Sequence, residues 1–358
     1  MKKFFMALAL AAVAMVATSC VQGDDDFAVK GPQKSVQFSL ANVISTRGVD
    51  AMIPDDATKV VLNDCQVFFV DATGNFHPGK DINDADAVQY FTTAPTAVQT
   101  FHFLPAAVEK VVVVGNYGSK ITATNLDAVK ALTATWTAQQ NDENLLVYGE
   151  AELVAATEND KHANTYVATV NVKPLVARIE IGGFVCDFSD TPAYEEVHVT
   201  MVALNNYYAD TTIGGTLSHH NNTTIDTDTA YPFFNATAPV GSKDDVSGVV
   251  LTKNEPSVDF ADDKYLVYHT FAGQVPQLVV RVKGVKGSVE SPLYLATKGF
   301  TKDGVSVTEF KAGEIYRMKF RGKNHFAFDE EDLSQPEKCV EVSIEVAEWV
   351  VVNVTPEF

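Results

Sequence analysis

Basic residues are the first shortage in this chain. Its 358 residues include 27 lysines and arginines against 46 aspartates and glutamates, a formal net charge of −19. A protein that binds nucleic acid needs clustered cations to displace phosphate counterions, so this composition excludes nucleic acid as a partner. The surplus of negative charge is typical of a soluble surface protein whose copies repel one another.

Cysteine is scarce as well, with four in the chain. Beyond Cys20 they are Cys65, Cys186 and Cys339, and the long, irregular spacing contains no Cys-x-x-Cys pair and no Cys/His cluster. We therefore expect no structural zinc site and no redox motif. The three later thiols allow one disulfide with one free cysteine, or three buried thiols, and the pattern does not choose between them.

Catalytic motifs are also missing. No HExxH, GxSxG, GxGxxG or P-loop pattern occurs. His219 and His220 are adjacent in a polar tract that we expect to be a surface loop through Asp228, and adjacent residues on an extended chain point opposite ways. We expect no catalytic residues, no metal and no cofactor, and hence no enzyme.

Helical periodicity is nearly absent, and apolar residues alternate with polar ones instead. The alternation predicts strands at 59–70, 110–114 and 166–172, separated by turns rich in Gly, Asn and Asp. One short helix is expected at 125–132, with Asn125 as its N-cap. Many short strands and few helices predict an all-β fold of packed sandwiches, and a hydrophobic fraction of 46% supplies the cores.

The first residues form an export signal. Lys2 and Lys3 precede an apolar stretch that is too short to span a membrane and that ends at small residues before Cys20. The segment 17–20 resembles a bacterial lipobox, so we expect residues 1–19 to be removed and Cys20 to be acylated. An ordinary signal peptide with an incidental cysteine is the alternative.

The exported chain is long enough for two domains at roughly 150 residues each. A proline that follows one predicted strand and precedes another places the boundary at 172/173. We expect an N-terminal sandwich at 48–172, a C-terminal sandwich at 173–325, and a hydrophilic linker followed by an apolar strand at 326–358.

A strand with one apolar face is predicted ahead of the first domain. Val36, Phe38 and Leu40 alternate with polar or small residues, and the Arg47–Gly48 bond follows in a small, polar stretch of the kind that proteases cut. The chain has only five arginines, so an arginine-specific protease has few sites. Arg321–Gly322 is a rival site.

The C-terminal tail has the same character. Its apolar alternation consists of four residues followed by a tryptophan, namely Val340, Val342, Ile344, Val346 and Trp349. It stands behind a flexible acidic linker. It is either a donor strand for another molecule or the final strand of its own domain.

These features together resemble the type V fimbrilins, the FimA/Mfa-type fimbrial subunits of Bacteroidales, over nearly the full length. The resemblance rests on the lipobox, the 46–48 junction, the segments 66–71, 176–181 and 313–318, and the tail from 342 to Phe358. Each segment is a loose match alone, and their order and spacing make the match specific.

The resemblance implies two transthyretin-like sandwich domains and a lipoprotein precursor on the outer membrane. It implies that an arginine-specific protease cuts after Arg47 and releases residues 20–47 with the strand 36–44. The C-terminal strand of another copy would then fill the groove, and successive copies would join head-to-tail into an extracellular fimbrium. Other partners would be minor anchor and tip subunits and host or bacterial surface receptors. A tip or anchor subunit, or a surface glycan-binding lipoprotein, is the alternative.

Overall fold

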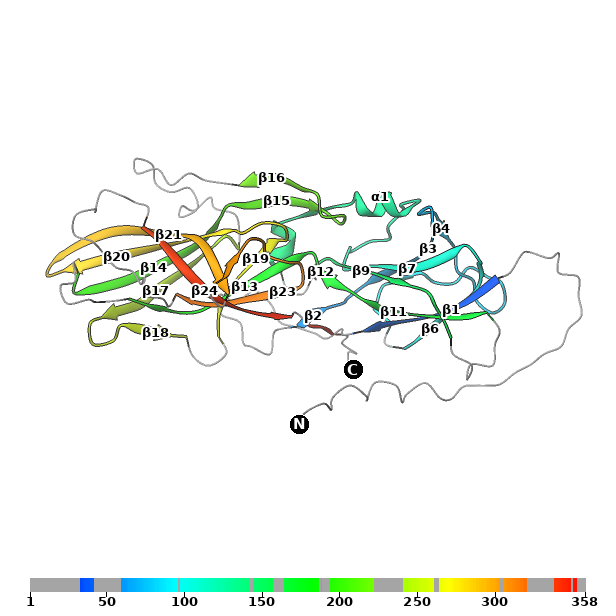
Figure 1. Ribbon diagram of the computed structural model, residues 1–358, viewed down its shortest axis with the longest axis horizontal. Coiled ribbons are helices and arrows are strands. Elements are labelled where there is room, and N and C mark those ends of the chain that lie inside the picture. The colour runs from blue at the N-terminus through cyan, green and yellow to red at the C-terminus, as the bar shows by residue number, and fades with distance from the viewer. Residues whose placement is uncertain are drawn as a thin grey trace, which may run out of the picture. The chain divides into compact units, whose positions relative to one another are not determined.

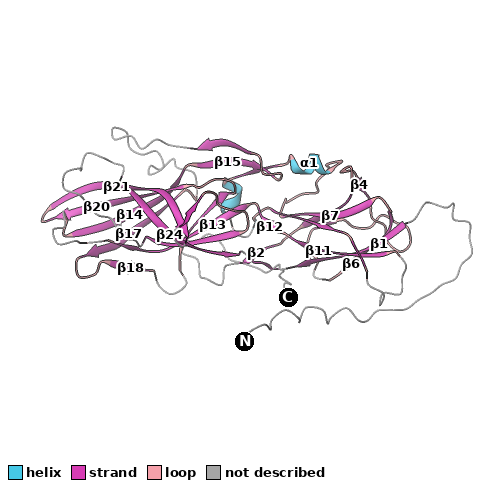
Figure 2. Cartoon of the chain, in the orientation of Figure 1, coloured by secondary structure: helices cyan, strands magenta, loops and turns pink. Residues whose placement is uncertain are grey.

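The computed structural model describes residues 33–41, 59–95, 97–141, 144–156, 164–186, 188, 194–221, 241–260, 264–302, 305–320, 338–348 and 350–352. These residues belong to one compact unit. Figures 1 and 2 show that its regular structure is almost entirely β-sheet, which confirms the all-β sandwich prediction.

Residues before 175 build two sheets. The first has the order β10-β11-β1-β6, from β10 (Val154–Ala155), β11 (Thr165–Asn171), β1 (Gln33–Ala41) and β6 (Gln99–Pro105). The second has the order β12-β9-β7-β3-β4 with β5 also on β3, from β12 (Lys173–Pro174), β9 (Val147–Glu152), β7 (Val108–Gly115), β3 (Cys65–Asp71), β4 (Phe76–His77) and β5 (Tyr90–Phe91). The side chains of β1, β3 and β7 share one core, where Phe69 meets Phe101 edge-on at 4.8 Å between ring centroids.

Residues from 176 onward build a set of ten linked strands with the order β17-β14-β20-β21-β24-β23-β13-β18. They are β17 (Lys243–Thr252), β14 (Glu196–Asn205), β20 (Gln277–Lys286), β21 (Val289–Lys302), β24 (Lys338–Glu348), β23 (Glu314–Phe320), β13 (Val176–Val185) and β18 (Ser257–Asp259), with β19 (Leu266–Phe271) on β13 and β22 (Val305–Val307) on β21. Nearly every residue of β13 is buried, including the charged Arg178 and Glu180, which pair with each other.

Two small sheets combine residues from both sides of the predicted 172/173 boundary. β8 (Thr133–Thr135) pairs with β15 (Tyr207–Thr212), whose other neighbour is β16 (Leu217–Asn221), and β2 (Lys59–Val61) pairs with β25 (Val350–Val352). Beside β8 and the short 3-10 helix η2 (Thr137–Gln140), the buried Trp136 donates from Nε1 to the carbonyl of His269 at 2.8 Å. The domain boundary itself stays a prediction.

Local signals explain two details. Helix α1 (Leu126–Lys130) begins where the sequence predicts, because the Asn125 side chain accepts a hydrogen bond from the Ala128 N–H at 2.8 Å. The single strand predicted at 59–70 is instead split into β2 and β3. At the break the Asn63 N–H donates to the Asn116 side chain, and the Asn116 N–H donates to the Asp64 carbonyl, so these groups leave the regular ladder.

Asp244 on β17 makes stability depend on pH. Burial raises the pKa of this carboxyl above its usual 3.8, although a hydrogen bond from Tyr268 opposes the shift. A raised native pKa means that the contribution of Asp244 is fully present below the unfolded pKa and is lost as pH rises through the native pKa. We expect Asp244→Asn to stabilise the protein more at pH 7 than at pH 3, as measured by urea unfolding across that range. An equal effect at both pH values would contradict this.

Candidate functional site: the N-terminal strand and the C-terminal strand

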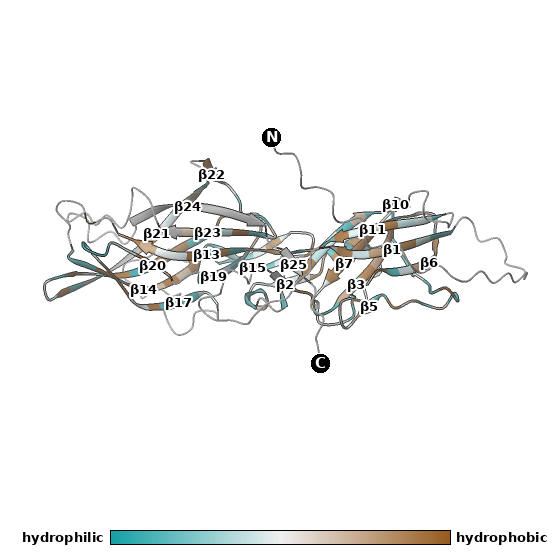
Figure 3. Ribbon diagram, turned by 90° about the horizontal axis from the view of Figure 1, so that it is seen from below, coloured by the Kyte–Doolittle hydropathy of each residue, from teal (hydrophilic) through white to brown (hydrophobic). Residues whose placement is uncertain are grey.

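β1 is an interior strand although it is the first strand that the structure describes. It runs parallel to β11 from Ser35↔Thr165 to Ala41↔Asn171, and antiparallel to β6 from Gln33↔Pro105 to Phe38↔Gln99. Figures 1 and 3 show β1 between these two neighbours. Removal of β1 would therefore expose two facing rows of backbone groups.

The apolar face that the sequence predicts for this strand lies in the core. Val36 is 0% and Phe38 1% exposed, and Leu40 is half-buried against the same cluster. Burial of one such side chain contributes about 1.5–3 kcal/mol. The N-terminal core is thus completed by a segment that precedes Arg47.

Polar contacts fix the start of β1, and the sequence analysis did not identify them. Lys34 Nζ donates to the Val108 carbonyl at 2.8 Å and lies over the Tyr166 ring, 4.5 Å from its centroid. The Ser35 hydroxyl and His102 Nδ1 are 3.1 Å apart. A lysine directly before an alternating run was the available signal, but lysine is common at strand ends.

A bulge in β6 sets the register at this place. Between the pairs Lys34↔Leu104 and Val36↔Phe101, β6 advances by three residues while β1 advances by two. The extra residue in β6 forms the bulge. Phe103 lies within this stretch at φ +56°, in the left-handed region that bulky residues rarely adopt. Any strand in the β1 position has to match this irregular edge.

β24 contains the predicted donor residues Val340, Val342, Ile344 and Val346. Residues 338–343 pair in parallel with β21, and residues 344–348 pair antiparallel with β23. The tail is thus paired within its own chain, as the second interpretation of the tail expects. Its role as a donor stays a prediction.

A row of charges lies on β13 and on β23, the strand that pairs with β24. Glu180 on β13 forms ion pairs with Arg178 Nε at 2.9 Å and with Arg317 Nε at 2.6 Å, and the side chains of Arg178 and Glu180 are fully buried. Arg317 also lies over the Tyr265 ring at 5.3 Å from its centroid. In the sequence, Arg178 and Glu180 stand two residues apart in an otherwise apolar strand. This spacing predicts that their side chains share a face of the sheet.

The remaining predicted site residues lie outside the described residues. They are the lipidation residue Cys20, the cleavage pair Arg47 and Gly48, and Trp349 of the tail. Their assignments stay predictions.

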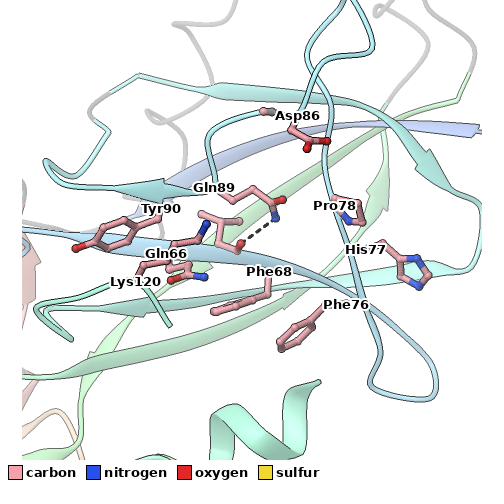
Figure 4. Close-up of a pocket in the computed structure, with 11 residues that line it drawn as sticks. Gln66, Phe68, Phe76, His77, Pro78, Asp86, Gln89, Tyr90 and Lys120 are labelled. Carbon is pink, nitrogen blue, oxygen red and sulfur yellow. Dashed lines mark hydrogen bonds between the residues drawn. The ribbon is translucent and has the colours of Figure 1, made fainter. Parts of the chain in front are cut away.

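A pocket of about 340 Å³ opens on the N-terminal half of the molecule. Phe68 and Phe76 lie together on one wall (Figure 4) and stack with their ring centroids 4.5 Å apart. The side-chain amides of Gln66 and Gln89 both bond to the backbone. Gln66 donates to the Ile121 carbonyl and accepts from the Ile121 N–H, and Gln89 donates to the Val67 carbonyl. These two amides therefore hold the fold together.

Thiols and histidines show how the remaining reactive side chains are placed. Cys65 and Cys186 are buried, and burial raises the pKa of Cys65 to about 12. His219 and His220 lie on β16. The prediction of a loop from 219 to 228 is therefore wrong for its first residues. His219 pairs with Asp210, and His220 pairs with Asn206.

In the described ranges, no group of three or more His, Cys, Asp or Glu is placed to hold a metal. In the same ranges no helix has the length and hydrophobicity to cross a membrane.

Comparison with known proteins gives matches at the level of structure. No family model and no curated protein sequence matches the chain. A candidate cell adhesion protein from Bacteroides eggerthii matches with TM-score 0.58 and 17% identity, over 91% of this chain and 98% of that one. Another from Parabacteroides distasonis matches with TM-score 0.52 and 13% identity, over 91% and 98%. A fimbrilin from Porphyromonas gingivalis matches with TM-score 0.51 and 15% identity, over 90% and 99%.

These matches extend over nearly the whole of each solved structure, so they concern the complete arrangement of sheets and not one common motif. At such low identity these matches establish the fold alone. The chain has the all-β fold of the fimbrilin and of the candidate cell adhesion proteins, as its resemblance to the type V fimbrilins implied.

Proposed function

We propose that this protein is the structural stalk subunit of a surface fimbria and that it polymerises by strand exchange. One observation carries the proposal: β1, an interior strand whose Val36 and Phe38 complete a core, comes from the segment ahead of Arg47. A strand that can be cut from its own chain leaves a groove that another copy can fill. The fold of a fimbrilin supports the same role.

The proposed assembly has three steps, namely export, cleavage and strand exchange. The precursor reaches the outer membrane as a lipoprotein acylated at Cys20, and an arginine-specific protease cuts between Arg47 and Gly48. The released β1 leaves a groove between β11 and β6, and the C-terminal tail of another copy enters it. Donor strand and groove belong to different sheets, so the contact would be head-to-tail and produce a fibre. Anchor and tip subunits would complete it, and adhesion to surface receptors is its output.

Release of the tail opposes this assembly, because β24 pairs with both β21 and β23. The exchange would therefore be slow and, once complete, long-lived. Deletion of the tail would also remove an interior strand of its own sheet. Variants at the cleavage site test the proposal without that complication.

We expect the purified precursor, treated with an arginine-specific protease, to acquire a new terminus at Gly48 and then to form a ladder of polymers on native gels. Arg47→Ala should abolish both, because the groove stays filled. Arg321→Ala, at the rival site, should leave both unchanged. N-terminal sequencing and gel analysis are the measurements, and a processed protein that stays monomeric would refute the proposal.

A further inference from the structure

We propose that the first half of β24 is a copy of β1, and that it enters the β1 position of another molecule in the same direction and register, with Lys338 in the place of Lys34. This inference rests on the proposed function and names the strand and the register of the exchange. Two segments of the chain, one in β1 and one in β24, have similar sequences.

The two segments match residue by residue. Residues 32–40 read PQKSVQFSL and residues 336–344 read PEKCVEVSI. The proline, the lysine, the first valine and the second serine are the same. The other positions pair Gln with Glu twice, Ser with Cys, Phe with Val and Leu with Ile, which keep shape or apolar character. Simple alternation requires apolar residues at every second position but does not require this lysine or these polar partners.

The two strands also have similar neighbours. β1 runs parallel to β11 and antiparallel to β6, and β24 runs parallel to β21 and antiparallel to β23. Each strand therefore has one parallel and one antiparallel neighbour, and in β24 the two neighbours pair with successive halves of the strand.

The groove contains specific contacts that the copy would reproduce. The Val108 carbonyl and the Tyr166 ring bind the Lys34 ammonium, and an ammonium at position 338 would take the same place. Ser39 Oγ lies 3.5 Å from Thr169 Oγ1, and Ser343 supplies the same hydroxyl. The apolar sites of Val36, Phe38 and Leu40 would receive Val340, Val342 and Ile344.

Release of β24 breaks its ladders with β21 and β23, but in the new position the first half of the strand gains backbone pairing. Among the described residues, the 338–343 half of β24 pairs with β21 alone, since the pairs with β23 begin at Ile344. In the β1 position the same half would have β11 on one side and β6 on the other. The exchange therefore gives this half of the strand a second ladder.

A cysteine of the tail allows a direct test. Thr165 is the register partner of Ser35, so in the polymer it should be the partner of Cys339 from the next molecule. Paired residues on adjacent strands lie within the Cα range that a disulfide spans. We expect Thr165→Cys, processed, assembled and then oxidised, to give a covalent ladder on boiled, non-reducing gels. The uncut variant should give none, because Ser35 occupies the position.

Two matched variants make the result decisive. Ser35→Cys with Thr165→Cys in the uncut precursor should close a disulfide within one chain, which shows that the geometry permits the bond. Val167→Cys, two residues along, would face position 341 and should give no ladder. Native polymers without a covalent ladder in Thr165→Cys, or a ladder in Val167→Cys, would overturn this register while leaving the proposed function intact. A failure to form native polymers at all would overturn the proposed function and this inference together.

The lysine site gives a second readout. Lys338→Met keeps the length of the side chain but loses the ammonium, and assembly should slow by roughly two- to fivefold, the worth of a cation over an aromatic ring. Lys338→Arg should assemble at the wild-type rate. Equal rates for the Met and Arg variants would contradict the placement of Lys338 over Tyr166.

Discussion

Phe38→Asp is expected to open the groove without any protease. The Phe38 side chain is 1% exposed in the core, and a carboxylate there has no water and no described partner cation on the apolar face of β1. We expect the N-terminal core to lose about 4 kcal/mol of unfolding free energy, the upper end for single substitutions. Because β1 is held by that face, the strand should detach while it remains covalently attached to the chain.

The consequence is assembly from uncut precursor. Phe38→Asp should form native polymers in the absence of protease, and urea unfolding of the monomer should show the loss of stability. Gln37→Asp is the matched control, since Gln37 lies on the opposite, half-buried face of the same strand. It should remain a stable monomer until it is cut. A destabilised Phe38→Asp monomer that never assembles would show that loss of β1 is insufficient for exchange.

Glu180→Ala is expected to have the second large effect. Its carboxylate joins Arg178 and Arg317, and its removal leaves the fully buried Arg178 without this anion. Breaking a buried ion pair by removal of one partner costs about 3–5 kcal/mol. Urea unfolding should show a loss of that size, located in the C-terminal sheet that contains β13, β23 and β24.

A compensated variant separates charge from packing. Arg178→Met combined with Glu180→Leu removes both fully buried charges while it keeps apolar volume, and should be more stable than Glu180→Ala, because apolar replacement of buried pairs is often neutral. The exposed Lys283–Glu290 pair serves as a control, and Glu290→Ala should leave the free energy of unfolding almost unchanged. If Glu180→Ala were as mild as Glu290→Ala, the charge row would not stabilise the sheet.

Alternation of apolar and polar residues along the chain predicted the strands, because a strand with one buried face has an apolar side chain at every second position. The pattern at 36–40 predicted β1 and its core face, and the Asn125 cap predicted the start of α1. Local patterns succeeded where the cause is local. They failed at 62–64, where a distant residue, Asn116, provides hydrogen bonds that interrupt the strand.

Relations between neighbouring residues were enough to predict an all-β protein with an apolar strand near each end, since the two-residue period and the capping residue are local properties. Only the tertiary structure decided that β1 lies between β11 and β6, that β24 lies between β21 and β23, and that Lys34 meets Tyr166 and Glu180 meets Arg317. The physical reason is that strand pairing and charge pairing join residues far apart in the chain, and alternation specifies which face a residue occupies but not which strand lies beside it.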